Sequence, residues 1–149
     1  MTTSPVKHGP ARVVRAEVTE APISVTELAD AVHDAAAGAV VTFEGVVRNH
    51  DADRGVSGIG YSCHLTAGQI VKEIARDVAE RGRVRALGVV HRVGDLAVGE
   101  AALAVAVSSD HRAEAFATCG EIVEEVKKRL PVWKRQTFSD GTSQWSNLA

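Results

Sequence analysis

The chain has 149 residues, which is enough for one domain with its own hydrophobic core. Apolar residues make up 45% and charged residues 24% of the chain, a balance that is ordinary for a globular protein and excludes a disordered one. The formal net charge of −2 excludes a general attraction to nucleic acid or anionic membranes, so any anion-binding site must be local.

The termini and cysteines indicate where the protein works. Cys63 and Cys119 are too few for a disulfide framework, and we expect both to be small core residues. The first ten residues, MTTSPVKHGP, lack the apolar core of a signal peptide, and no apolar run is long enough to span a bilayer. We therefore expect a cytoplasmic protein with a loose tail at 1–10 and one domain over 11–149.

The first half of the chain alternates strand-like and helix-like segments. Residues 11–19 partly alternate between apolar and polar and predict a strand. Ser24 and Glu27 have capping-box spacing and predict a helix that runs to about residue 37. The β-branched segment 38–50 predicts a central strand, and the polar stretch 49–58 predicts an exposed loop.

The second half continues the mixture. A short strand around 59–65 and a helix over 66–81 are expected first. Strands at 83–94 and 100–109, joined by the turn GDLAVGE, follow next. The spacing then predicts a long helix over about 111–130, with an apolar stripe of Ala113, Phe116, Ala117, Gly120, Val123, Val126 and Leu130.

Pro131 cannot continue this helix, so the segment VWKRQTF is expected to be a strand. Asp140-Gly141 then offers a tight hairpin. Strands and helices mix without a strict alternation, and hairpin signals are frequent. The sequence therefore predicts an α+β domain with a mixed, largely antiparallel sheet and two main helices.

Three basic groups stand out as candidates for an anion site. Arg48 and His50 lie where a strand enters a loop, which is a common place for binding groups or simply a solvated strand end. His111 and Arg112 begin a helix, whose free N–H groups favour anions. In the alternative interpretation, neighbouring acidic residues neutralise Arg112.

The third group begins with Lys127, near the C-terminal end of the long helix. Helical geometry puts Lys127 at the border of the apolar stripe, where its amine either extends into solvent or reaches a pocket. Lys134 follows Trp133 on a strand, so these two side chains point to opposite faces. Converging arginine and lysine side chains would suit a phosphate ester.

Four segments carry a more specific signal: GAVVTFEGVVRNH, VVHRVGDLAVGE, VAVSSDHRAEAF and LPVWKRQ. Together they resemble the signature segments of the molybdopterin synthase catalytic (large) subunit family. The resemblance runs from about residue 38 to Trp145, with every segment in the family's order. Several separated motifs in register are far more specific than any one of them.

This resemblance implies an α/β-hammerhead-type domain and a central homodimer. Each protomer would bind one small ubiquitin-like sulfur-carrier subunit, giving a heterotetramer. The carrier's C-terminal thiocarboxylate would supply sulfur, and the enzyme would convert cyclic pyranopterin monophosphate to molybdopterin in molybdenum cofactor biosynthesis. Because the sulfur arrives on the partner, neither a metal nor a resident cofactor is expected.

The resemblance also implies a set of site residues. Lys127 matches the lysine most closely tied to activity, Lys134 matches a second pocket lysine, and both are expected to be catalytic. Arg48 matches an arginine before a flexible loop, and His111 with Arg112 matches a pair that helps bind the phosphate. The full expected substrate-binding set is Val46, Val47, Arg48, His111, Arg112, Lys127, Lys134, Arg135 and Gln136.

These roles are chemically coherent. Arginine and histidine cations would hold the cyclic phosphate and stabilise the charge that develops as its ring opens. A lysine amine would anchor the anionic thiocarboxylate beside the pterin. Lys127 or Lys134 could also move protons during loss of water.

The chain departs from the family pattern in four places. Val132 sits where a second aromatic residue is common, and the chain stops soon after Trp145, with little C-terminal tail. The segment IGYSCHLTAG at 59–68 differs from the usual acidic-aromatic strand, and Gln136 stands where an acidic residue often follows the basic pair. Tyr61 and His64 could replace lost contacts, although a plain strand also explains them.

Two other functions remain open from the sequence. A non-catalytic docking module for a ubiquitin-like sulfur carrier would keep the fold but lose turnover; the joint presence of the basic residues argues against it. A metal-dependent hydrolase would use His50, His64, His91 and His111, although their spacing matches no metal motif.

Overall fold

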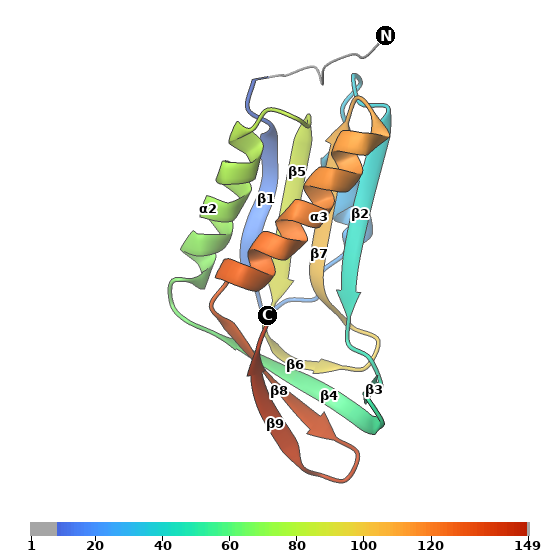
Figure 1. The fold of residues 1–149 in the computed structure, drawn as a ribbon, viewed down its shortest axis with the longest axis vertical. Coiled ribbons are helices and arrows are strands. Elements are labelled where there is room, and N and C mark those ends of the chain that lie inside the picture. The colour runs from blue at the N-terminus through green and yellow to red at the C-terminus, as the bar shows by residue number, and fades with distance from the viewer. Residues whose placement is uncertain (1–8, 149) are drawn as a thin grey trace.

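Most of the hydrophobic core packs on a four-stranded sheet (Figure 1). In this computed structural model, which describes residues 9–148, the strands cross the sheet in the order β1 (Arg12–Thr19), β5 (Ala86–Arg92), β7 (Ala101–Ser109) and β2 (Ala39–Val46). β1 and β5 are parallel, and the other neighbours are antiparallel. The predicted mixed, largely antiparallel sheet is confirmed. The tail expected at 1–10 lies outside the described residues, apart from Gly9 and Pro10.

Helices cover both faces of this sheet. α2 (Ala67–Glu80) and α3 (Arg112–Arg129) lie side by side on one face, and α1 (Val25–Ala31) packs on the other (Figure 1). The central strands β5 and β7 are buried along nearly their whole length, because side chains on both of their faces meet a helix. α2 and α3 are the two main helices expected from the sequence, and the α+β class is confirmed.

A second sheet lies at one end of the first (Figure 1). Its central strand β4 (Arg54–Cys63) pairs antiparallel with both β8 (Val132–Phe138) and β6 (Gly94–Ala97). β3 (His50–Asp51) forms a short hairpin with β4, and β9 (Ser143–Asn147) pairs with β8. Val47, Leu96 and Ala102 pack together where the two sheets meet.

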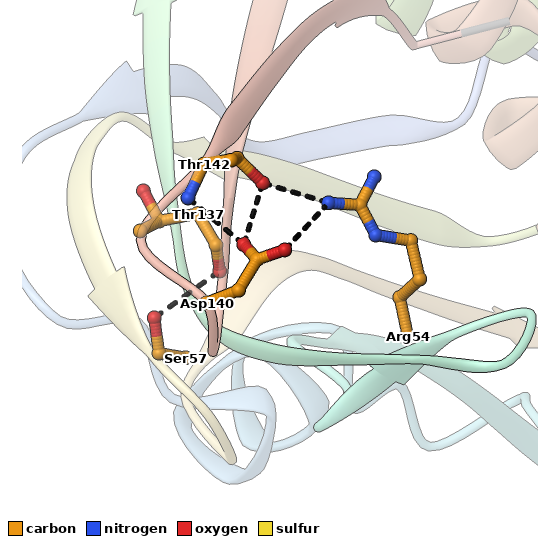
Figure 2. A network of polar contacts seen from close by, with 5 residues as sticks. All are labelled: Arg54, Ser57, Thr137, Asp140 and Thr142. Carbon is orange, nitrogen blue, oxygen red and sulfur yellow. Dashed lines mark hydrogen bonds and ion pairs between the residues drawn. The ribbon is translucent and has the colours of Figure 1, made fainter.

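A polar network ties the β8–β9 hairpin to β4 (Figure 2). The Arg54 guanidinium donates to the Thr142 hydroxyl at 2.7 Å and lies 3.5 Å from the Asp140 carboxylate. Asp140 accepts from both the hydroxyl and the backbone N–H of Thr142, and these bonds lower the pKa of Asp140. The Ser57 hydroxyl donates to the Thr137 carbonyl oxygen at 3.1 Å. Together these contacts hold β8, which carries one of the predicted lysines, against β4.

Some boundaries differ from the sequence-based expectations. β2 is an edge strand and not a central one, and its burial alternates along its length. Residues 49–58 form the β3–β4 hairpin and not a loop, with Ala52 at a φ of 52° in the turn. The segment between β5 and β7 contains β6 and is more than a turn. Cys119 is buried as expected, whereas Cys63 is exposed at the end of β4.

α1 is also shorter than predicted. Ser24 caps it as expected, by accepting from the backbone N–H of Glu27 at 3.2 Å. The helix ends at Ala31, and a distant side chain caps this end: the Arg12 guanidinium donates to the carbonyl oxygens of Ala31 and His33. Such a tertiary cap leaves no local signal in the helix sequence.

The buried face of α3 matches the predicted stripe only toward its C-terminal end, where Val123, Val126 and Leu130 are buried as expected. Its buried residues are Ala115, Thr118, Cys119, Ile122, Val123 and Val126. Four of the predicted residues are exposed instead, namely Ala113, Phe116, Ala117 and Gly120. The Phe116 side chain, which anchored the prediction, is 64% exposed. An apolar strip on α3 therefore lies outside the core, where Phe116 and Gly120 border a groove with Val41 and Phe43 of β2.

Candidate active site

Strand pairing between β4 and β8 places the first site residues. Lys134 lies opposite Tyr61, and Gln136 lies opposite Ile59. Residues directly opposite each other in an antiparallel pair share one face of the sheet. Lys134 and Gln136 are therefore on the same face, whereas Arg135 between them is on the other.

This face borders a cavity of about 280 Å³, which we call the polar pocket. Lys127 reaches it from the last turn of α3, Lys134 from β8, and Arg48 from the segment after β2. Three predicted cations thus converge on one place from three elements. The polar pocket is lined by Val46, Arg48, His50, Ile59, Tyr61, Lys127, Lys134 and Gln136.

A second cavity, of about 150 Å³, adjoins the first, and we call it the apolar pocket. It is lined by Phe43, Gly45, Val46, Tyr61, His91, Ala102, Leu103, Val126, Lys127, Lys134 and Leu148. Lys127 and Lys134 line both cavities. Their side chains therefore border the place where a charged group in the polar pocket would meet a ring in the apolar pocket.

One carboxylate tempers the positive charge of the polar pocket. Asp51 accepts a hydrogen bond from the Gln136 amide at 3.2 Å and lies 4.0 Å from the Arg48 guanidinium. The Arg48 side chain is 67% exposed and the contact is long, so this ion pair is weak. Arg48 can therefore turn to an anionic ligand, and Asp51 fixes the orientation of the Gln136 amide.

His111 and Arg112 lie far from these lysines in the same chain. His111 is the residue before α3, and Arg112 is its first residue; both are exposed. Lys127 is fifteen positions after Arg112 in the helix, which is about 22 Å along the helix axis. The nearby Asp110 carboxylate is held by the Arg85 guanidinium at 2.6 and 2.9 Å. One chain alone does not bring the predicted phosphate-binding pair to the pockets.

Two other predicted residues are also placed elsewhere. Val47 is buried at the junction of the sheets, and its backbone N–H and C=O pair with Glu100 and Gly99. Arg135 borders a separate cavity on the opposite face of β4 and β8, with its guanidinium 5.8 Å from the centre of the Trp145 ring. The Val47 backbone groups and the Arg135 guanidinium therefore do not face Lys127 and Lys134.

Other residues outside the predicted site set also line the pockets. Tyr61 is half-buried on the floor between the two pockets, and burial raises its pKa. His91 at the end of β5 and Leu148 near the C-terminus line the apolar pocket. Alternation along 59–63 could have indicated Tyr61, but its partner strand was unknown. His64 does not line either pocket; it contacts Thr66.

His91 predicts a pH dependence of stability. Burial lowers its pKa to about 4, from 6.5 in the unfolded chain, and outweighs its hydrogen bond to the Arg92 carbonyl. Between these two pKa values the unfolded state binds more protons than the folded state, so the free energy of unfolding rises with pH. The contribution of His91 to this free energy is complete above about pH 6.5. A shift of this size corresponds to about 3 kcal/mol, lost as the pH falls toward 4.

We expect urea unfolding at pH 4 and pH 7 to measure this loss. The His91→Gln variant has no imidazole to protonate, so its loss between the two pH values should be smaller by about 3 kcal/mol. Equal losses in the two proteins would show that His91 does not carry the effect.

Two absences complete the description of residues 9–148. They contain no helix that is both long and apolar enough to cross a membrane. In the same part of the chain, no three His, Cys, Asp or Glu side chains gather closely enough to hold a metal ion.

Comparison with known proteins identifies the family. The profile of a family described as MoaE protein matches residues 18–129. A molybdopterin synthase from Staphylococcus aureus has the same fold, with a TM-score of 0.81 and 27% identity over 89% of this chain and 96% of that one. A Helicobacter pylori structure, described as a complex of subunits 1 and 2 of molybdopterin-converting factor, shares the fold at a TM-score of 0.65 and 18% identity, over 91% of this chain and 89% of that one.

Sequence relatives agree with this assignment. The molybdopterin synthase catalytic subunit of Aspergillus clavatus is 36% identical over 91% of this chain and 69% of its own length. The Nostoc protein of the same name is 34% identical over 88% and 81%, and that of Thermoplasma volcanium is 32% identical over 87% and 95%. A family profile that covers most of the chain and relatives above 30% identity together show that this protein belongs to the family of molybdopterin synthase catalytic subunits.

Proposed function

We propose that this enzyme converts cyclic pyranopterin monophosphate to molybdopterin, with sulfur supplied by the C-terminal thiocarboxylate of a small ubiquitin-like carrier subunit. One observation carries the proposal: Lys127 and Lys134 stand together at the junction of the polar and apolar pockets. An anionic sulfur donor needs cations, and a pterin ring needs a concave surface with apolar side chains such as those of Phe43 and Leu103. The two pockets offer both at one place.

The roles of the residues follow from their positions. The Lys127 and Lys134 amines hold the thiocarboxylate beside the pterin. They also exchange protons with the pterin substrate as each of its oxygen substituents leaves. Arg48 adds positive charge at the open side of the polar pocket. Each transfer moves sulfur from the carrier's thiocarboxylate to the substrate, and hydrolysis by water leaves the carrier with a carboxylate, so the reaction calls for no resident cofactor and no cysteine nucleophile on this chain.

A second copy of the chain completes the proposed site. His111 and Arg112 lie about 22 Å from Lys127 along α3, too far to share one substrate within a protomer. β2 is an edge strand, and the groove beside it exposes Phe116, Val41 and Phe43. A two-fold contact along this flank would run the two α3 helices in opposite directions. His111 and Arg112 of one copy would then approach the lysine end of the other.

The same arrangement supports the proposed assembly. A homodimer along β2 and α3 leaves the second sheet free at each end for one carrier subunit, which gives a heterotetramer. The relatives are named catalytic subunits, and a protein called a catalytic subunit works with at least one subunit of another kind, which supports this assembly. We place the enzyme in the cytoplasm, where a thiocarboxylate and the free thiols of Cys63 and Cys119 stay reduced.

Reconstitution tests this function directly. Purified chain, thiocarboxylated carrier and cyclic pyranopterin monophosphate are mixed, and the dithiolene product is converted to a fluorescent derivative. We expect product that depends on all three components. A stable complex with the carrier but no product would favour the docking-module function, and neither product nor complex would contradict both.

A further inference from the structure

His91 is a buried, titratable residue that the proposed chemistry does not use. It lies at the end of β5 in the segment VVHRVG, and its side chain is 2% exposed. It nevertheless lines the apolar pocket together with Lys127 and Lys134. An imidazole at this depth beside two lysines calls for an explanation.

Two contacts fix the imidazole ring. Nδ1 lies 2.8 Å from the carbonyl oxygen of Arg92, so this nitrogen carries the proton and donates it. The Tyr61 ring packs edge-on against the imidazole, with ring centres 5.3 Å apart and planes at 71°. Tyr61 comes from β4 and His91 from β5, so the ring is held between the two sheets.

The other ring nitrogen is a free acceptor. With the proton on Nδ1, Nε2 carries a lone pair and no hydrogen. Within residues 9–148, Nε2 makes no hydrogen bond. It also keeps some exposure, because the one fully enclosed side-chain polar atom without a partner in that range belongs to Glu114. His91 lines the apolar pocket, so a ligand bound there is the partner available to Nε2.

The other polar side chains of this pocket all carry donors. Lys127 and Lys134 in their charged form have donors and no acceptor. Tyr61 has one hydroxyl, which both donates and accepts. His91 therefore supplies the pocket's dedicated acceptor for a ligand with N–H groups, next to cations that attract the anionic part of the same ligand.

We propose that His91 is a specificity-determining and positioning residue, whose Nε2 accepts a hydrogen bond from an N–H group of the pterin in the apolar pocket. This inference rests on the proposed function for the identity of the ligand. The bond fixes how the ring sits, and thereby which carbon atoms face the lysines. A buried acceptor also rejects ring systems that lack the matching N–H, because Nε2 would be left unpaired.

Two variants separate this role from a structural one. In His91→Asn the side-chain amide can keep the donor to the Arg92 carbonyl, but it removes the acceptor at Nε2. In His91→Gln the longer side chain places an amide oxygen near the former Nε2. We expect His91→Asn to raise the KM for cyclic pyranopterin monophosphate about tenfold, with kcat changed much less, and His91→Gln to recover most of the loss.

Equilibrium binding of cyclic pyranopterin monophosphate, measured by calorimetry without the carrier, gives the same comparison independently of turnover. Thermal unfolding reports whether each variant is folded. Unchanged affinity in folded His91→Asn, or a Gln variant no better than the Asn variant, would overturn the inference. If the wild type binds the pterin through His91 but forms no product, the proposed function fails and the inference stands.

Discussion

Replacing Lys127 with alanine is expected to lower the rate of dithiolene formation by roughly a hundredfold to ten-thousandfold, the range for loss of a positioned proton-transfer group. Lys127 lines both pockets, so its amine is placed to touch the thiocarboxylate and the substrate together. Its side chain is exposed and not part of the core, so the fold should survive. Single-turnover measurement of product, with circular dichroism of the variant, tests both statements.

Lys128 provides a matched control for this experiment. It is the next residue on α3, is equally cationic and exposed, and lines neither pocket. Lys128→Ala removes the same charge from the same helix end and should leave the rate within about twofold of the wild type, as for an ordinary surface substitution. Equal rates for the two variants would remove Lys127 from the mechanism.

Mixing two inactive variants is expected to restore activity if the site is shared between copies. Arg112→Ala and Lys127→Ala homodimers should each be strongly impaired. In a heterodimer of the two, one site contains intact Lys127 from one chain and intact Arg112 from the other, while its twin lacks both. Purified heterodimers should therefore recover about half of the wild-type activity per chain.

The control pairs Lys127→Ala with Lys134→Ala. Both lysines line the pockets of the same chain, so every site in that mixture carries a defect and no recovery is expected. Activity is measured after co-expression with two different affinity tags and purification through both. Failure of Arg112→Ala and Lys127→Ala to complement, in purified heterodimers, would show that Arg112 does not serve the partner's site.

The sequence determined the local structure and the chemistry of the site. Capping by Ser24, helical spacing through Ile70, Ile74 and Val78, and the β-branched runs of β5 and β7 depend on near neighbours in the chain, so they could be predicted. Lys127 was placed at the border of the core from helical geometry alone. The match of four separated segments to one family identified the candidate cations before any contact was known.

Tertiary structure alone decided which of those cations meet. The pairing of Lys134 with Tyr61 depends on the register of β8 against β4, two strands that are distant in the chain. The position of β2 at the edge, and the outward face of Phe116, follow from how α3 lies on the sheet. Apolar residues on two faces of a helix leave that choice open to local reasoning, because the packing partner decides which face is buried. For the same reason the sequence could not distinguish His91 from the other histidines, because only the fold places its ring in the pocket that Lys127 and Lys134 line.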